Sequence, residues 1–385
     1  MKNLLLLLSI CLSNSFFPQS PNGFDLIACS SSDGINWTNN TLFQDSAGVP
    51  SITQHSTGTI YCAFQWFPAP ASPTNTAFDK IAVKKSTDGG VTWGTPTLAV
   101  FNGFPTSYKR PFDPTLVIAD NGQVRMYFSS SKTNTLTMLD STYHCYSAIS
   151  TDGVNYTWEP GVRIAVADSI TIDPAAVKIV STWHYTAPRA FPAAGAFHFI
   201  SNDGLAFTRT TTIASDASHN FTGNLMSDLP GGGSSYRFYG TPSPQTGLIW
   251  FKSTIDGIGW NPTFTNCVGS ITSNGVQADP AVIKLGAGNY IMVYVSKYSN
   301  VMGLSKNKNE NSTFTIYPNP LKDQIHLTLN NNSTIEEINI YDTESKLVFH
   351  STENISSFKH NLNKGVYFIE VKTKKTSETK KIIID

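Results

Sequence analysis

A turn sequence that recurs along the chain constrains the fold more than any other feature. Its fullest copy reads Ser-Thr-Asp-Gly-Gly-Val-Thr-Trp over residues 86–93, directly after an apolar strand pattern at 81–85. The variants, each with a hydroxyl residue, an Asp-Gly pair and a closing aromatic residue, lie at 27–37, 146–156, 197–207 and 249–260. Five similar units at spacings of roughly 50 to 65 residues predict a radially repeated fold.

The residue types of the repeat predict a hairpin turn. Glycine permits the positive φ that a tight turn needs, and the aspartate and serine side chains accept or donate hydrogen bonds within the turn. The aromatic residue is expected to pack under the hairpin as an anchor. The aspartates of the repeat are therefore interpreted as structural. In the last copy Ser253 is taken as the hydroxyl residue, which gives a longer approach to Asp256.

The copy at 86–93 resembles the Asp box of sialidases and related β-propellers. It alone has the full spacing of that family, and the other four are variants. The resemblance implies a propeller fold. It does not by itself imply sialidase activity, because such boxes also occur in propellers with other functions.

A second repeated element precedes each box and predicts how the ring closes. The expected inner strands begin at Val49-Pro50, Asp113-Pro114, Asp173-Pro174, Met226–Leu229 and Asp279-Pro280. The last unit has no box after it, and the first box has no inner strands before it. Joining the two ends makes one blade, with 24–43 supplying the outer strands beside 279–296, and leaves no free sheet edge. We therefore expect an all-β fold with a five-bladed β-propeller.

The N-terminus and the charge balance bear on location and partners. Met1-Lys2-Asn3 precedes a short apolar run at 4–12, which predicts a secretory signal peptide over 1–19 rather than a membrane span, and no later transmembrane segment is expected. The formal net charge is zero, so nothing indicates nucleic acid or an anionic membrane as a partner. The remaining cysteines lie singly in different predicted strands and are expected to be buried free thiols, with disulfide pairing as the alternative: Cys29, Cys62, Cys145 and Cys267.

The last part of the chain predicts a second domain. A polar linker at 304–312 is followed by alternating apolar and polar residues, which predict a small immunoglobulin-like β-sandwich over 313–385 and leave 20–303 for the propeller. Tyr317-Pro318-Asn319-Pro320, Gly365-Val366-Tyr367 and the basic terminal strand resemble the type A C-terminal sorting domain of the type IX secretion system of Bacteroidetes. The resemblance implies export across the outer membrane, with the secretion machinery as partner, and then release or attachment to the cell surface. An ordinary accessory module is the alternative.

Three aspartates are the candidate catalytic residues. Asp113, Asp173 and Asp279 begin inner strands, which converge at one mouth of a propeller, and crowded carboxylates raise one another's pKa as acid–base catalysis requires. The Asp-Pro strand starts also resemble five-bladed glycosidases that cleave arabinan and xylan. Two departures stand out: Val49 lies where that family would place its base, and Glu159, expected in an outer strand, is the propeller's only glutamate. A glycosidase would have to use aspartate for both roles.

Other readings of these aspartates remain open, and further residues are candidates for binding. Asp-Pro also suits a strand start for structural reasons, and a ring of carboxylates suits Ca²⁺; no other cofactor or metal is expected. Candidate substrate-binding residues near the same mouth are Trp66, Tyr108, Arg110, His184, Arg189 and, as a looser fourth carboxylate, Asp228. The leading hypothesis is a secreted carbohydrate-active propeller, a sialidase-like or arabinanase-like glycosidase. The alternative is a non-catalytic propeller that binds glycan or protein.

Overall fold

The computed structural model describes residues 24–68, 75–132, 143–167, 169–189, 192–228, 235–269, 276–296, 314–317, 323–329, 334–343, 346–374 and 377–384. The chain divides into two compact units, Met1–Tyr298 and Ser299–Asp385. The expected signal peptide, the polar linker and residues 318–320 lie outside the described ranges. The described elements are strands apart from one short 3₁₀ helix, Pro192–Ala194.

The described residues of the first unit form five separate sheets, whose strands are given from the axis outward. Sheet 1 is β3 (Ala47–Gln54), β4 (Ile60–Trp66), β5 (Lys80–Ser86) and β6 (Thr97–Leu98). Sheet 2 is β8 (Phe112–Ile118), β9 (Val124–Ser131), β10 (Tyr143–Ser150), β11 (Asn155–Ile164) and β7 (Val100–Asn102). Sheet 3 is β12 (Ala175–Ile179), β13 (Thr182–Pro188), β14 (Ala196–Ser201) and β15 (Thr208–Arg209). Sheet 4 is β16 (His219–Ser227), β17 (Tyr236–Pro242), β18 (Trp250–Thr254) and β19 (Thr265–Asn266). Sheet 5 is β20 (Ala278–Gly286), β21 (Asn289–Ser296), β1 (Asp25–Ser31) and β2 (Trp37–Gln44).

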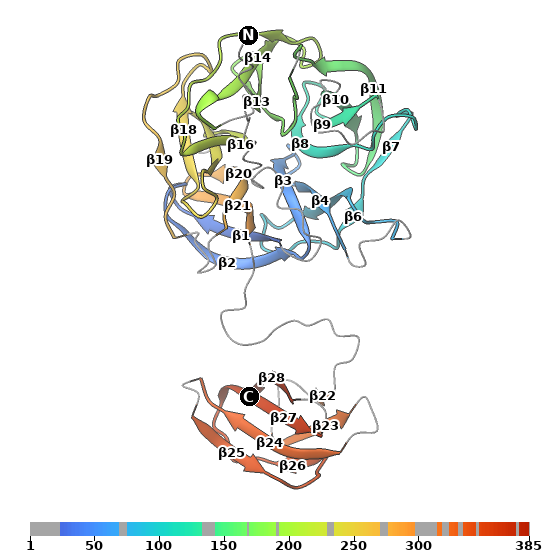
Figure 1. Ribbon diagram of the computed structural model, residues 1–385, viewed down its shortest axis with the longest axis vertical. Coiled ribbons are helices and arrows are strands. Elements are labelled where there is room, and N and C mark those ends of the chain that lie inside the picture. The colour runs from blue at the N-terminus through green and yellow to red at the C-terminus, as the bar shows by residue number, and fades with distance from the viewer. Residues whose placement is uncertain are drawn as a thin grey trace, which may run out of the picture. The chain divides into compact units, whose positions relative to one another are not determined.

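The five sheets stand around a common axis and form a closed ring (Figure 1). Their innermost strands contact one another in the order β3, β8, β12, β16, β20 and back to β3. The ring closes through sheet 5, where β1 pairs with β21 in a continuous antiparallel register from Asp25↔Ser296 to Ser31↔Tyr290. The expected pairing of 24–43 with 279–296 is therefore present, and it ties the beginning of the unit to its end by backbone hydrogen bonds.

Sheet 4 differs from the sequence prediction. Its inner strand is β16, His219–Ser227, and not a strand that begins at Met226. The irregular pairing that marks the head of the inner strands falls at 220–223 in β16, as it does at 112–115 in β8 and 278–281 in β20. Phe221 and Thr222 therefore take the place that Asp-Pro takes in those two strands. Without proline, this strand head had no recognisable sequence signal.

The repeated turn joins the third strand of each sheet to the next strand segment and is held by its own side chains. In the turn at 86–93 the Ser86 hydroxyl donates to Asp88 at 2.8 Å, and Asp88 accepts the Thr92 backbone N–H at 2.9 Å. Hydrogen bonds from the side chain and backbone of Thr92 lower the pKa of Asp88 to about 2. The structural interpretation of these aspartates is supported.

The fifth turn corrects one prediction. Thr254, and not Ser253, donates to Asp256 at 3.2 Å and accepts the Gly257 backbone N–H at 2.8 Å. The hydroxyl-to-aspartate spacing is therefore the same as in the other four turns. Threonine carries the same hydroxyl group as serine, so either residue can hold the turn at this position.

Each of these turns packs its glycine against the second strand of the preceding sheet. A Cβ at Gly153 would lie 2.3 Å from the Tyr61 ring, and one at Gly257 would lie 2.4 Å from His184. The remaining pairs follow the same order around the ring: Gly90 against Ile291, Gly204 against Arg125 and Tyr127, and Gly34 against Arg237 and Tyr239. The turn glycines are thus required for close packing between sheets as well as for positive φ.

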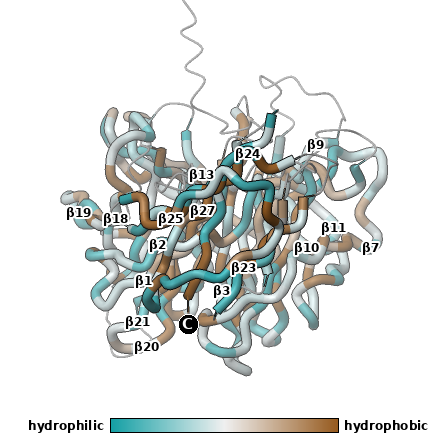
Figure 2. Tube along the Cα trace, turned by 90° about the horizontal axis from the view of Figure 1, so that it is seen from below, coloured by the Kyte–Doolittle hydropathy of each residue, from teal (hydrophilic) through white to brown (hydrophobic). Residues whose placement is uncertain are grey.

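Apolar residues between adjacent sheets form the cores of the first unit, and the alternation along the strands can be followed in Figure 2. The box aromatics take part: Trp37 and Tyr156 are fully buried, and Trp93 packs edge to face on Phe43. All four described cysteines are buried and free, which confirms the expected thiols.

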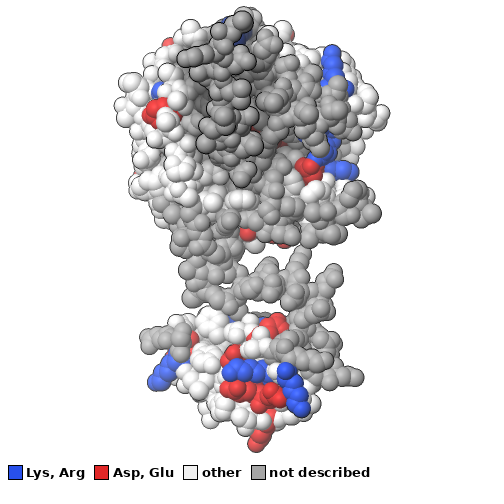
Figure 3. Space-filling model, viewed as in Figure 1, with Lys and Arg blue, Asp and Glu red and all other residues white. Residues whose placement is uncertain are grey.

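The second unit consists of two sheets around one apolar core. The first sheet orders β22 (Phe314–Tyr317), β23 (Gln324–Leu329) and β26 (Ser357–Lys359). The second orders β25 (Leu347–Ser351), β24 (Ile335–Tyr341), β27 (Gly365–Thr373) and β28 (Ser377–Ile384). Isoleucines from both sheets meet inside, including Ile325, Ile338, Ile369 and Ile382. Acidic and basic side chains gather on this unit (Figure 3), where Lys372 lies between Glu337 and Glu370 at 3.1 and 3.7 Å.

Candidate functional site

Three carboxylates from well-separated parts of the chain meet where the inner strands begin. Asp113 lies at the head of β8, Asp279 at the head of β20, and Asp173 two residues before β12. Each precedes a proline and each has a positive φ, at 49°, 47° and 52° respectively. This backbone conformation is uncommon outside glycine, although aspartate tolerates it better than most residues. We call these three residues the hub carboxylates.

The hub carboxylates are close enough to affect one another's ionisation. Burial, and then the charge of Asp279, raise the pKa of Asp113 to about 7. Burial raises the pKa of Asp173 well above its usual range, and the charges of Asp113 and Asp279 add to this. Burial also raises the pKa of Asp279, to about 6, against hydrogen bonds from Thr222 and Thr241. At neutral pH the group therefore holds fewer than three negative charges.

Asp113 is the most enclosed member and is held by a chain of polar contacts. It is 2% exposed, whereas Asp173 and Asp279 are partly exposed. Its backbone N–H donates to the Gln65 side chain at 3.5 Å, and Gln65 in turn donates to Asp79, which is ion-paired with Arg110. Within the described part of the chain, the buried Asp113 Oδ2 has no hydrogen-bond partner.

Two of the five inner-strand heads carry no carboxylate. Val49 takes the position in β3, with a φ of 49° and partial exposure, and the buried Phe221 takes it in β16. A β-branched residue at positive φ is a backbone outlier that the surrounding structure has to hold in place. Three of the inner-strand heads therefore present an acidic residue to the hub, and the other two present an apolar residue.

Three predicted binding residues of sheets 1 and 2 are engaged in other contacts. Arg110 is bound to both the carboxylate and the backbone carbonyl of Asp79. Tyr108 packs edge to face in an aromatic cluster with Phe104, Tyr146 and Trp158. Trp66 ends β4 and packs on the apolar core between sheets 5 and 1. Arg110 reaches the hub only indirectly, through Asp79 and Gln65.

Two further predicted binding residues lie at the box end of their strands, away from the hub. Asp228 follows the last residue of β16, at the far end from Thr222. It accepts from Tyr290 at 2.6 Å and lies 3.0 Å from Lys284. Its position was mispredicted because the start of β16 was misplaced. His184 lies near the start of β13, buried under the turn at Gly257, and its Nδ1 lies 3.0 Å from His198 Nε2.

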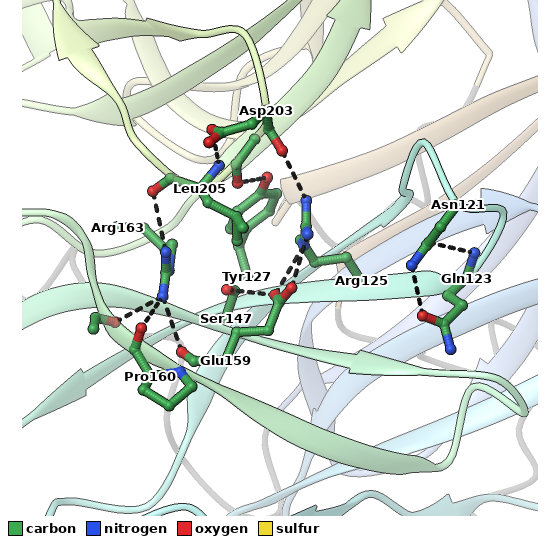
Figure 4. Close-up of polar contacts among 12 residues, drawn as sticks. Asn121, Gln123, Arg125, Tyr127, Ser147, Glu159, Pro160, Arg163, Asp203 and Leu205 are labelled. Atoms are coloured by element: carbon green, nitrogen blue, oxygen red, sulfur yellow. Dashed lines mark hydrogen bonds and ion pairs between the residues drawn. The ribbon is translucent and has the colours of Figure 1, made fainter.

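Arg189 and Glu159 are also engaged in other contacts. Arg189 follows β13, donates to the Ala194 carbonyl at 3.2 Å and lies over the Phe197 ring. Glu159 lies in the outer strand β11, as expected, where it forms an ion pair with Arg125 at 2.8 Å and accepts from Ser147 (Figure 4). No described glutamate of the first unit therefore reaches the hub.

Neither a metal cluster nor a membrane-spanning helix is found among the described residues. No three His, Cys, Asp or Glu side chains in those ranges are arranged to hold a metal ion. In the same ranges, no helix has the length and apolar character needed to cross a bilayer.

The fold and the site define an all-β protein with an acidic hub, joined to a second β unit that has a recognisable role. Residues 315–385 match the family model of the secretion system C-terminal sorting domain. The sorting domain expected from the sequence is thereby confirmed, and it indicates export with secretion or attachment at the cell surface. A search of curated proteins gave no significant match.

Several solved structures are similar to the chain at low identity. A Dyadobacter fermentans protein of unknown function matches with a TM-score of 0.48 and 14% identity, covering 73% of this chain and 86% of that one. A glycosyl hydrolase from Bacteroides ovatus gives 0.44 and 12%, covering 66% and 84%. The arabinanase of Bacillus subtilis gives 0.44 and 12%, covering 69% and 95%. TM-scores below 0.5 do not establish a shared function.

Proposed function

We propose that this chain is an exported carbohydrate-active protein in which a five-bladed β-propeller carries a hydrolytic site at its hub. The five sheets are its blades, and the turns at 86–93 and its four variants are its Asp boxes. The type A sorting domain of the type IX system is its export signal. The observation that carries the proposal is the meeting of Asp113, Asp173 and Asp279. The charge of Asp279 raises the pKa of Asp113, and the charges of Asp113 and Asp279 raise the pKa of Asp173.

Hydrolysis of a glycosidic bond needs one carboxylic acid that donates a proton and one carboxylate that acts as base or nucleophile. A set of mutually repelling carboxylates supplies both, because one member stays protonated while another ionises. Partial exposure of Asp173 and Asp279 makes these two the members that contact substrate. Asp113, enclosed and tied to Gln65, acts on the ionisation of Asp173.

A non-catalytic glycan-binding or protein-binding propeller is the second candidate. It is favoured by the placement of the unit's single glutamate, Glu159, in an outer strand, ion-paired with Arg125. A sialidase-like activity has less support. Arg110, Arg189 and Arg237, available for a carboxylate clamp, are bound to Asp79, to Ala194 and to Asp228 respectively.

The test is a screen of hydrolysis and binding against plant and host glycans, with and without added Ca²⁺. The chain without its predicted signal peptide is compared with Asp113→Asn, Asp173→Asn and Asp279→Asn. Asp120→Asn is the control, because Asp120 is an exposed carboxylate paired with Lys178. We expect turnover that each hub variant lowers by at least about 100-fold and the control leaves unchanged. Binding without turnover in the parent would favour the second candidate.

A further inference from the structure

Two of the hub aspartates are held through their backbone by a side chain from the preceding sheet of the ring. The Asp279 N–H donates to Thr241 Oγ1 at 2.8 Å, and the Asp113 N–H donates to Gln65 Oε1 at 3.5 Å. Both aspartates lie where the pairing of their inner strand is irregular, so neither has a partner residue in the register of its own sheet. A backbone donor in the interior needs an acceptor, and here the adjoining sheet supplies it.

The Thr241 hydroxyl is fixed in orientation by a second hydrogen bond. Its single proton is donated to the Thr222 carbonyl at 2.9 Å, which leaves its oxygen to accept from the Asp279 N–H. The same oxygen lies 3.4 Å from Asp279 Oδ1. Thr222 belongs to the head of β16, so Thr241 joins the heads of two adjacent inner strands. It is 1% exposed, and water therefore does not compete freely for these bonds.

Gln65 is engaged in the same way. Its Nε2 donates to the carboxylate of Asp79, which directly precedes β5 of the same sheet, and its Oε1 accepts from the Asp113 N–H of the next sheet. Gln65 is 3% exposed. In both cases the donor end of the side chain is bound within its own sheet, which directs the acceptor end toward the next sheet's aspartate.

Gln65 and Thr241 occupy equivalent positions in their sheets. Each is the residue of the second strand that pairs just before the irregularity at the inner-strand head, Gln65 with Gly48 and Thr241 with Asn220. The equivalent residues of sheets 2 and 5 pair with Phe112 and Ala278, and that of sheet 3 lies two residues beyond the pair Ala175↔Thr186. These three residues are Ser129, Val295 and Pro188.

The side chain at this position matches the residue at the head of the next inner strand. A polar side chain precedes each aspartate, and an apolar one precedes each apolar head. Ser129 Oγ is buried and has no hydrogen-bond partner within the described ranges, so the contact is present for two of the three aspartates. The five pairs are Gln65 with Asp113, Ser129 with Asp173, Pro188 with Phe221, Thr241 with Asp279 and Val295 with Val49.

We propose that Gln65 and Thr241 are positioning residues that set the backbone of Asp113 and Asp279, and with it the direction of each carboxylate into the hub. These aspartates have φ angles of 49° and 47°, a conformation that the surrounding structure has to hold in place. The positioning stands on the contacts alone. Its consequence for turnover rests on the proposed hydrolase function.

Amide hydrogen exchange of the full chain without its predicted signal peptide, followed by NMR, tests the contact at Asp279. The reference is the Val282 amide, which donates to Asn224 at 2.9 Å between the same two sheets. The ratio of the two exchange rates cancels a general loss of stability. Thr241→Val keeps the side-chain shape and is expected to raise the ratio of Asp279 to Val282 by at least about 10-fold, because one buried hydrogen bond is lost.

Two variants control for the loss of a hydroxyl group. Thr241→Ser should keep the parental ratio. Thr186→Val should also keep it, because the buried Thr186 hydroxyl has no partner among the described residues. A ratio that Thr241→Val leaves unchanged, or that Thr241→Ser raises equally, would overturn the inference. If Thr241→Val does not fold, Thr241→Ala provides the same comparison with Thr241→Ser.

The contact at Asp113 has its own reference and control. The Leu116 amide donates to Ser51 Oγ at 2.8 Å between sheets 1 and 2. Gln65→Met should raise the exchange of the Asp113 amide relative to that of Leu116. Gln44→Met, which replaces a buried glutamine bound to Asp45, should not. Equal effects of the two variants would contradict a positioning role for Gln65.

These measurements need no substrate, so absence of turnover would refute the hydrolase proposal and leave the positioning to be decided by exchange. If turnover is found, Thr241→Val should lower kcat by about 10- to 100-fold with little change in KM, because a displaced carboxylate reacts poorly with a substrate that still binds. Thr241→Ser should restore kcat. An unchanged kcat in Thr241→Val would overturn the catalytic consequence.

Discussion

The Tyr239 hydroxyl donates to the Gly34 carbonyl at 2.9 Å, across the boundary between sheets 4 and 5. Arg237, two residues earlier, donates to the Asp33 carbonyl of the same turn at 3.1 Å. Tyr127 and Arg125 hold the turn at Asp203-Gly204 between sheets 2 and 3 in the same way, at 2.7 and 3.5 Å. An Arg-x-Tyr pair in the second strand is thus a repeated clasp on the next sheet's turn.

The clasp predicts the effect of removing one hydroxyl. Tyr239→Phe should cost about 1–2 kcal/mol of unfolding free energy, because the buried Gly34 carbonyl loses its partner. Urea denaturation measures this loss. Tyr127→Phe is the matched variant and should give a similar loss, whereas a negligible effect of both would mean that the clasp does not stabilise the ring.

Substituting a turn glycine should destabilise the fold more when neighbouring atoms lie close to the added Cβ. Gly153→Ala places a methyl group against the Tyr61 ring at a φ of 70°, so both overpacking and backbone strain destabilise it, by about 3 kcal/mol or more. Gly122→Ala is the control, because its φ is 80° and nothing lies within 4 Å of the added Cβ. That variant should lose about 1–2 kcal/mol. Equal losses in denaturation midpoint would argue against sheet-to-turn packing.

The buried histidine pair between sheets 3 and 4 predicts acid sensitivity. Burial, and then the charge of His184, lower the pKa of His198 to about 4 from an ordinary value of 6.5. The unfolded chain then binds more protons between these values, so this histidine's contribution to stability is lost as pH falls from 6.5 to 4. The loss amounts to about 2–3 kcal/mol. The melting temperatures of the parent and His198→Gln should converge as the pH falls. Parallel plots of melting temperature against pH would contradict a lowered pKa for His198.

The hub carboxylates predict the opposite dependence. Their pKa values are raised in the folded state, to about 7 for Asp113 and about 6 for Asp279, so stability falls as pH rises from about 4 to 7. Asp279→Asn removes the charge that raises the pKa of both Asp113 and Asp173, and should therefore raise the melting temperature at pH 8 more than at pH 5. Asp120→Asn, away from the hub, should show no such difference. A destabilised Asp279→Asn at pH 8 would mean that the carboxylates do not repel one another.

Two valines at positive φ predict stabilising substitutions. Val49 lies in the hub with a φ of 49°, and Val180 is 84% exposed with a φ of 56°. This backbone conformation is strained for valine and suits asparagine or glycine better. Val49→Asn and Val180→Asn should each gain about 1 kcal/mol in thermal or urea unfolding. A gain at Val180 alone would show that the Val49 side chain contributes packing at the hub that offsets its backbone strain.

The sequence by itself determined the features that depend on local chemistry. The pattern of Ser86, Asp88 and Gly89 predicts a turn, and it occurs in five units. The first unit lacks inner strands and the last lacks a box, which predicts a ring closed by 24–43. Gly365-Val366-Tyr367 also indicated the sorting domain directly, because the domain has a characteristic sequence pattern, and residues 315–385 match its family model. Asp113, Asp173 and Asp279 were found because Asp-Pro marks a strand head.

Only the tertiary structure decided which side chains share the hub. Asp228 directly follows the inner strand β16, and His184 lies in the second strand β13. These strands are nine and seven residues long, and both side chains lie at the end of the strand that is far from the hub. Thr241 gave no signal, since a threonine in a strand is ordinary until a carboxylate from another sheet, here Asp279, is placed beside it. The ionisation of Asp279 depends on such contacts between sheets, and these are set by how the ring closes.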